Sequence, residues 1–233
     1  MCDVIIDARE FASRVSLFVA AMTGGRPLDA DERAMLKTLA TRGRPEQGAV
    51  RLPVPWLEER ARLLAEAPVA CLPPGTSWGW KEPNTHIVLP QLLRELPGLR
   101  YVHVVRNGLD MAFSRNQSQL AFWGERWLGR QVRPGPRDAL TYWCMVHRRV
   151  QEIGDAMGSR FLWLDYDALC ADPAEGFAIL ADFLGLPVTD TEPLLPLVRP
   201  QPTTGRHREH PLSIFDPADL DYLSGIGHLQ QAA

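Results

Sequence analysis

The chain has 233 residues, of which 45% are hydrophobic, and its formal net charge is -3 at pH 7. This length accommodates one α/β domain with a sizeable core, or such a domain with a helical appendage. The slightly acidic balance excludes an overall basic surface of the kind that binds nucleic-acid phosphates. No apolar run approaches the roughly 18 residues that span a bilayer.

The N-terminus and the cysteines point to a reducing compartment. The sequence MCDVIIDAREF has no basic region followed by an apolar stretch, so it does not look like a secretory signal. Four cysteines, at positions 2, 71, 144 and 170, lack the spacing of a metal-binding cluster. We therefore expect free thiols, a cytoplasmic location and no metal.

The first part of the chain is predicted to be helical. Apolar residues recur at helical spacing over 8–23, and Gly24-Gly25 ends that helix. Asp29 is a plausible N-cap for a second helix over about 30–41, and a third helix is expected over 56–67. With no clear strand among them, these segments are expected to form a helical flap or lid.

The pattern then changes to alternating strands and helices. TSWGWKEP indicates a short strand or extended segment ending near Lys81. The elements expected after it are a helix from Asn84 or Thr85 to about Leu96, the strand RYVHVV, a helix from about Leu109 to Leu120, a long helix over 138–157, the strand RFLWLDYDAL, a helix opened by Asp172-Pro173 and a short helix after Asp216-Pro217. This alternation predicts an α/β fold with a parallel sheet and crossover helices.

Arg106 follows the clearest strand, at the end of the sheet where ligands bind in such folds. A helix N-terminus after it would offer free N–H groups, and the guanidinium offers bidentate donors suited to phosphate. Ser114, about one and a half turns into that predicted helix, would add a hydroxyl. The alternative is a structural ion pair of Arg106 with Asp110 or Asp165, and the local sequence leaves both interpretations open.

Three segments together resemble the sulfotransferases that use 3'-phosphoadenosine 5'-phosphosulfate (PAPS). WGWKEPNTHIVLPQLLRELPGLRYVHVVRNGLDMAFSRN resembles their lysine-proline segment, helix and strand–arginine–helix–serine element. FLWLDYDALCADPAEGFAILADFLGLP resembles their Tyr-(Glu/Asp)-Asp-Leu strand and Asp-Pro helix, and TTGRHREH resembles their late Gly-Arg loop. The three lie in the expected order over roughly residues 77–210.

The resemblance implies a three-layer parallel sheet of the P-loop NTPase type, in a single domain. Residues 1–70 would form a helical lid or acceptor region, and 71–233 the nucleotide-binding α/β core. The implied reaction moves a sulfonate from PAPS to a hydroxyl or amine of a small-molecule, glycan or lipid acceptor, without a metal. Neither nucleic acid nor a membrane span is expected, and a homo-oligomer stays open.

The resemblance also implies roles for individual residues. Arg106 and Ser114 match the pair that holds the 3'-phosphate, and Gly205 and Arg206 match the loop that covers it. Lys81 matches a lysine that contacts the bridging oxygen or the sulfonate, where an ammonium stabilises charge on the leaving phosphate. The alternative for Lys81 is a surface lysine.

As a surface lysine, Lys81 would form an ion pair with Glu82. Glu82 and His86 are the candidate general bases for the acceptor hydroxyl, and the alternative for His86 is a core or helix-surface histidine. Trp123 and Trp127, four residues apart, either line an acceptor pocket or pack within the core. A structural role is expected for Tyr166 and its acidic neighbours.

The sequence departs from the family at the reactive end of the nucleotide. Members carry an Arg-Ser-Gly-Thr-(Thr/Ser) loop after their first strand, whose amides hold the 5'-phosphosulfate, and no such sequence occurs here. We therefore expect the N-terminal strand to be missing, with a gap in the sheet near Arg106. His207 stands where many members have tryptophan.

Two rivals remain. One is a catalytically degenerate relative that binds a nucleotide or anion as a partner protein. The other, a P-loop kinase or NTPase, is disfavoured because no Gly-Lys-(Ser/Thr) occurs in the sequence.

Overall fold

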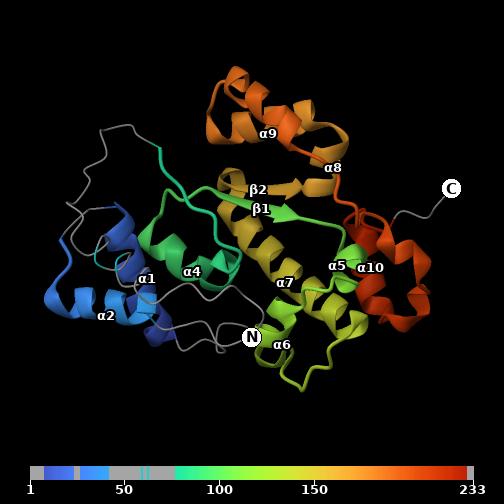
Figure 1. Cartoon of the computed structure of the whole chain (residues 1–233), viewed down its shortest axis with the longest axis horizontal. Coiled ribbons are helices and arrows are strands. Elements are labelled where there is room, and N and C mark those ends of the chain that lie inside the picture. Colours follow the sequence, from blue (N-terminus) through green and yellow to red (C-terminus); the bar gives the residue numbers. More distant parts are fainter. Residues whose placement is uncertain (1–7, 24–26, 42–58, 60–61, 63–76, 230–233) are drawn as a thin grey trace. The chain divides into compact units, whose positions relative to one another are not determined.

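The computed structural model describes residues 8–23, 27–41, 59, 62 and 77–229 (Figure 1). The chain divides into two compact units, residues 1–97 and residues 98–233. The predicted helix over 56–67 lies almost wholly outside the described residues. The expected division of the domain at residue 70 therefore stays a prediction.

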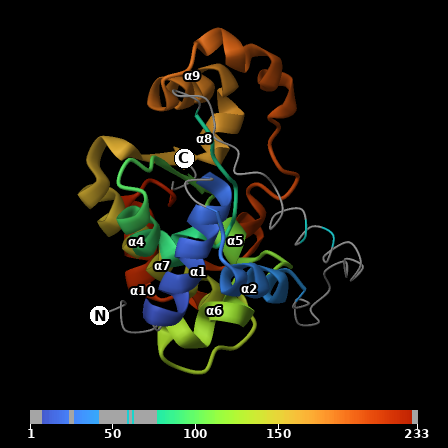
Figure 2. The same ribbon diagram turned by 90° about the vertical axis from the view of Figure 1, so that its left-hand side faces the viewer.

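The described part of the first unit contains three helices. Helix α1 (Ala8–Thr23) packs against α4 (Thr85–Glu95), as both views show (Figure 1 and Figure 2). Helix α2 (Ala30–Thr41) begins with a capping box, in which the Glu32 amide donates to the Asp29 carboxylate at 2.8 Å and the Asp29 amide donates to the Glu32 carboxylate at 3.0 Å. These three helices confirm the predictions for their segments.

The sequence TSWGWKEP predicts a short strand or an extended segment, and the segment 77–82 before α4 contains no strand, so the strand alternative is wrong. Its tryptophans make local contacts instead of joining a sheet. The Trp80 indole N–H donates to the Thr85 hydroxyl at 3.1 Å, and its ring meets that of Phe18 edge-on at 5.4 Å. Trp78 stacks on Trp80 at 5.7 Å. The segment is thus fixed through side chains to α1 and α4.

The second unit is built around two parallel strands. Strand β1 (Tyr101–Val105) pairs with β2 (Phe161–Asp165), with Val105 opposite Asp165. Helix α7 (Pro136–Met157) connects them along one face, and α8 (Tyr166–Ala171) and α9 (Pro173–Leu184) lie on the other (Figure 1). This is an α/β crossover unit, as predicted. The described residues contain only these two strands, so the larger three-layer sheet is not established.

Alternating side chains of the strands fill both interfaces. Leu164 of β2 packs with Leu169 and Phe177 of the α8–α9 layer. On the opposite face the rings of His103 and Trp163 contact His147 of α7, at 5.0 and 5.7 Å between ring centroids. The period of two along each strand therefore explains how so short a pair supports two helical layers.

The helix predicted from Leu109 to Leu120 is two helices, α5 (Gly108–Ala112) and α6 (Ser118–Leu128). Polar side chains between them bind the backbone and interrupt the helix. The Asn116 amide donates to the Ser114 hydroxyl at 3.2 Å, and the Gln117 side-chain amide donates to the Ser114 carbonyl at 2.7 Å. Ser114 therefore lies in the turn after α5, not within a helix.

The rest of the unit consists of capped helices and short 3-10 turns. Asp172 caps α9 through the Glu175 amide at 3.1 Å, and Asp216 caps α10 (Pro217–Gly225) through the Ala218 amide at 2.9 Å. The 3-10 segments are η2 (Gly158–Arg160), η3 (Val188–Leu197), η4 (Arg206–Glu209) and η5 (Leu212–Ile214). Among the described residues, no helix is both long and apolar enough to cross a bilayer.

Two neighbouring valines of β1 provide a matched test of this packing. Val105 is 0% exposed and Val104 is 56% exposed. We expect Val105→Ala to lower the free energy of unfolding by about 2 kcal/mol, because it removes buried methyl groups and leaves a cavity. Val104→Ala has the same chemistry and should change it by no more than about 0.5 kcal/mol. Urea unfolding measures both, and equal losses would contradict the assigned faces of β1.

Candidate functional site

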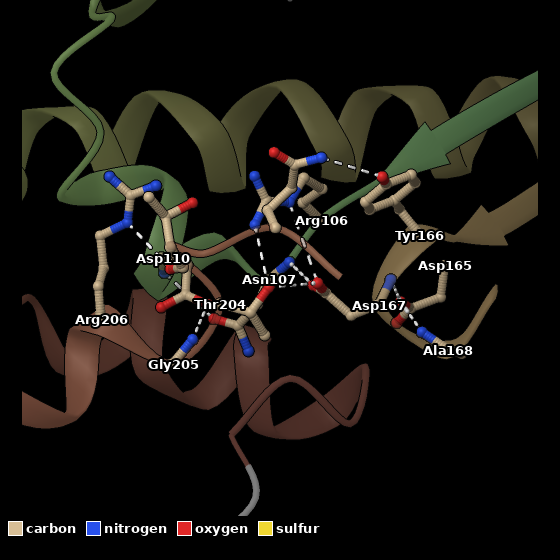
Figure 3. Close-up of polar contacts among 12 residues, drawn as sticks. Arg106, Asn107, Asp110, Asp165, Tyr166, Asp167, Ala168, Thr204, Gly205 and Arg206 are labelled. Atoms are coloured by element: carbon tan, nitrogen blue, oxygen red, sulfur yellow. Dashed lines mark hydrogen bonds and ion pairs between the residues drawn. The ribbon is translucent and has the colours of Figure 1, made fainter. Parts of the chain in front are cut away.

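Asn107 joins the carboxyl ends of the two strands. Its amide donates to the Asp167 carboxylate at 2.9 Å (Figure 3). Its side-chain amide donates to the His228 carbonyl at 2.9 Å. Its side-chain oxygen accepts from the amides of Leu109 and Asp110, at 3.0 and 3.3 Å. One residue thus caps α5, reaches across to α8 and holds the C-terminal segment.

Asp165 links the end of β2 to α8 and to the C-terminal segment. Its carboxylate caps α8, accepting from the amides of Asp167 and Ala168 at 2.8 and 3.0 Å (Figure 3). Its second oxygen lies 3.1 Å from Nε2 of His228. Burial raises the pKa of the Asp165 carboxyl, but the hydrogen bonds, led by that of His228, outweigh burial and hold the pKa below its ordinary value.

Arg106 is held more loosely than its neighbours. Its Nε is buried and makes no hydrogen bond to any described residue, and it lies 4.0 Å from the Asp167 carboxylate. A terminal nitrogen lies 3.5 Å from the Thr204 hydroxyl, at the limit of a hydrogen bond, and the guanidinium is 5.8 Å from the centre of the Tyr166 ring. The guanidinium therefore retains strong donors for an anion.

The alternative interpretation of Arg106 named the wrong carboxylates. Among the described contacts, its ion pair is with Asp167, while Asp165 binds His228 and Asp110 binds the loop 203–207. The reason is that β1 and β2 end side by side, which brings the residue after Asp165–Tyr166 next to the one after Val105.

The loop 203–207 is attached to α5 through Asp110. The Asp110 carboxylate accepts from the Gly205 amide at 2.7 Å (Figure 3). It also accepts from the His207 amide at 3.1 Å and lies 2.7 Å from the Nδ1 of His207. Burial raises the pKa of the Asp110 carboxyl, but these hydrogen bonds outweigh burial and keep the pKa below its ordinary value. Gly205 has a φ of 82°, which a residue with a side chain rarely adopts.

Arg206 fixes the loop to the other end of α5. Its guanidinium donates to the Phe113 carbonyl at 3.2 Å and to the Thr203 carbonyl at 3.1 Å. Phe113 immediately precedes Ser114, which is half-buried. The structure thus brings four predicted binding residues together around the short helix α5: Arg106, Ser114, Gly205 and Arg206.

The N-terminus of α5 has fewer free amides than the helix predicted from the sequence would offer. Helix α5 is only five residues long, and the Asn107 side chain already accepts from two of its first amides. The donors that remain around α5 are therefore mainly those of the arginine side chains, the hydroxyls and the loop.

Tyr166 holds the segment that leads into the loop, which fits the structural role expected for it. Its hydroxyl donates to the Arg199 carbonyl at 3.2 Å and accepts from the Gln201 side-chain amide at 3.2 Å. The segment leading into the loop is thereby held at the end of β2.

The predicted catalytic residues lie in the first unit. Lys81 is exposed, and no ion pair between it and Glu82 occurs among the described contacts. The Glu82 carboxylate accepts from the amide and the side chain of Asn84, at 3.1 and 2.8 Å. His86 is buried on α4. The catalytic roles of Lys81, Glu82 and His86 remain predictions.

The two tryptophans of α6 differ in exposure. Trp127 is buried, and Arg149 of α7 lies over its ring at 4.8 Å. Trp123 is half-buried. The contacts of Trp127 are those of core packing. Within the described part of the chain, no group of three or more His, Cys, Asp or Glu residues is arranged to hold a metal ion.

Sequence reasoning missed the residues that organise this site, namely Asn107, Thr204 and His228. Asn107 carried a usable signal, because an asparagine between a strand and a helix is a typical N-cap. The partners of Thr204 and His228 lie far away in the sequence, so no local pattern indicates them.

A comparison with protein families matches residues 12–190 to the Sulfotransferase family, which is more than half of the chain. The chain belongs to this family. The match supports sulfonate transfer in general and includes Lys81, Arg106 and Ser114, but it ends before the loop 203–207. Searches among curated proteins and among solved structures gave no match.

The lowered pKa values of the Asp110 and Asp165 carboxyls make the free energy of unfolding depend on pH. A carboxyl whose pKa is lower in the folded state stabilises that state above the unfolded value of about 3.9, and the contribution is lost as the pH falls through the folded value. We expect the free energy of unfolding to decrease below about pH 4, and to decrease less steeply in Asp165→Asn. Urea unfolding from neutral to acidic pH tests this, and parallel profiles would contradict it.

Proposed function

We propose that the protein transfers a sulfonate group from PAPS to a hydroxyl or amine acceptor. Membership of the sulfotransferase family supports a transferase of this general kind. The observation that carries the choice of donor is Arg106, whose buried Nε has no hydrogen-bond partner among the described residues at the carboxyl end of β1. Neither the family match nor the described contacts favour a catalytically degenerate binding partner.

The residues around α5 suit the 3'-phosphate of this donor. A phosphate dianion needs several donors and nearby positive charge. Arg106 and Arg206 are guanidinium groups, and Ser114 and Thr204 are hydroxyls close to them in the same unit. Arg106 also has an exchangeable partner, since its 4.0 Å contact with Asp167 is too long for a hydrogen bond and is easily replaced by a bound anion.

The 5'-phosphosulfate end has no such assignment. The Arg-Ser-Gly-Thr loop that holds it in relatives is absent from the sequence. The expectation of an absent first strand stays a prediction, because residues 1–7 and most of 42–76 lie outside the described part. The fit is therefore to the nucleotide's 3' end.

Lys81 and one of two bases would serve the transfer itself. PAPS supplies an activated sulfonate, and its departure leaves negative charge on a phosphate oxygen. The Lys81 ammonium, as a compact cation, would stabilise that charge in the transition state. Glu82 or His86 would accept the proton of the acceptor group. Of these, Glu82 is exposed but bound to Asn84, and His86 is buried.

Arg106→Ala tests the binding part of the proposal. It should weaken binding of adenosine 3',5'-bisphosphate by about 1.5–3 kcal/mol, the typical contribution of a hydrogen bond to a charged group. Arg100→Ala is the matched control, because it changes the net charge equally. Arg100 precedes the same strand and is exposed. Titration calorimetry measures both, and equal affinities in the two variants would sink this assignment.

Lys81→Ala tests the catalytic part. We expect kcat to fall by roughly 100-fold or more while affinity for the bisphosphate changes little, because the ammonium would act on the transition state. Lys37→Ala is the control, since Lys37 is the other lysine of the chain and is exposed on α2. Steady-state kinetics with PAPS measure the effect. Weaker bisphosphate binding with unchanged turnover would assign Lys81 to binding instead.

A further inference from the structure

A single buried carboxylate makes most of the hydrogen bonds that join the loop 203–207 to α5. Asp110 is 1% exposed, and its two oxygens receive two backbone N–H groups and face the His207 ring. The partners are 95 and 97 residues away in the sequence. No other contact of the loop with α5 brings together so many hydrogen bonds among the described residues.

The chemistry of this contact makes it strong. Hydrogen bonds to an ionised carboxylate are shorter and about twice as strong as neutral ones. A buried carboxylate without partners is costly, so Asp110 and the loop satisfy each other's requirements together. The left-handed backbone of Gly205 accompanies this contact, because it allows the amides of Gly205 and His207 to turn toward the same carboxylate.

The loop places the Thr204 side chain beside Arg106 and the Arg206 side chain at the end of α5. The Thr204 hydroxyl, one residue before the Gly205 anchor, is 3.5 Å from Arg106 and 3.5 Å from the Asp167 carboxylate. Arg206, one residue after that anchor, reaches the carbonyl next to Ser114. Gly205 thus sits between Thr204, which lies near Arg106, and Arg206, which reaches the end of α5.

We infer that Asp110 is a positioning residue, whose carboxylate holds the loop 203–207 so that, before the nucleotide binds, Thr204 stands beside Arg106 and Arg206 stands at the end of α5 next to Ser114. Asp110 itself does not touch the nucleotide, because both of its oxygens are occupied by the loop. This inference rests on the proposed function and names a residue that supports the 3'-phosphate selectivity of that site. Its effect on affinity comes from preorganisation, since a loop already in place costs less to order on binding.

Two substitutions separate this role from general stability. Asp110→Asn replaces one acceptor oxygen by an N–H donor, so at least one of the three loop contacts must be lost. Asp219→Asn is its matched control, because Asp219 is also buried in the second unit but accepts from Thr141 on α7, at 2.7 Å. Both variants remove a buried negative charge, and only the first touches the loop.

His207 provides a rescue test. His207→Leu removes the ring donor to Asp110, whereas His207→Asn keeps an N–H donor at the same place in the side chain. We expect His207→Leu to lower the preference for the bisphosphate in the same direction as Asp110→Asn, but by less. His207→Asn should keep a preference close to that of the parent protein.

The measurements are affinity for adenosine 3',5'-bisphosphate, affinity for adenosine 5'-monophosphate, and amide hydrogen exchange. In Asp110→Asn the preference for the bisphosphate should fall about tenfold or more, as expected for lost hydrogen bonds to charged groups. Exchange should accelerate over 203–208 and stay unchanged in β1 and α7. Asp219→Asn should keep the preference.

The outcomes distinguish the inference from the proposed function. If the parent protein does not prefer the bisphosphate, the proposed function fails, whatever Asp110 does. If the parent prefers it and Asp110→Asn keeps that preference, the inference is overturned. Faster exchange throughout the unit in Asp110→Asn, with both ligands weakened equally, would show a purely structural role and also overturn it.

Discussion

The parallel register of β1 and β2 is the constraint on which the rest of the second unit depends. Because Val105 lies opposite Asp165, both strands end at the same level, and the residues that follow them meet. Asn107 then bonds to Asp167, and the capping of α5 and of α8 is linked through this one contact. A shift of the register by one residue would reverse the faces of every strand side chain and separate this junction.

Charge is distributed unevenly around that junction. Three aspartates lie within it, but Asp110 and Asp165 are occupied by a loop and by His228, and only Asp167 faces Arg106. The carboxylates of Asp110 and Asp165 therefore bind backbone N–H groups, whereas the buried Nε of Arg106 has no hydrogen-bond partner among the described residues. An acidic cluster can therefore surround a site proposed for an anion, because hydrogen bonds from the protein already stabilise most of the carboxylate charge.

Local physics explains which features were predictable. Helices with aspartate caps and a clear apolar period, such as α2 and α9, could be placed closely, and β1 was evident from its β-branched and aromatic residues. The helix over 109–120 failed because Ser114 and its polar neighbours bind the backbone. Arg106 could be found because a strand end is a local signal. The role of Asp110 could not, because its partners lie 95 or more residues away.

That separation has a kinetic consequence. The chain must close a loop of nearly a hundred residues before Gly205 can reach Asp110, and such long-range contacts form slowly and late in folding. The strand pair and α7, by contrast, join segments that follow one another more closely. A nascent or partly unfolded chain would therefore hold its central layers while the loop 203–207 is still detached from α5, so this contact would form last and be lost first.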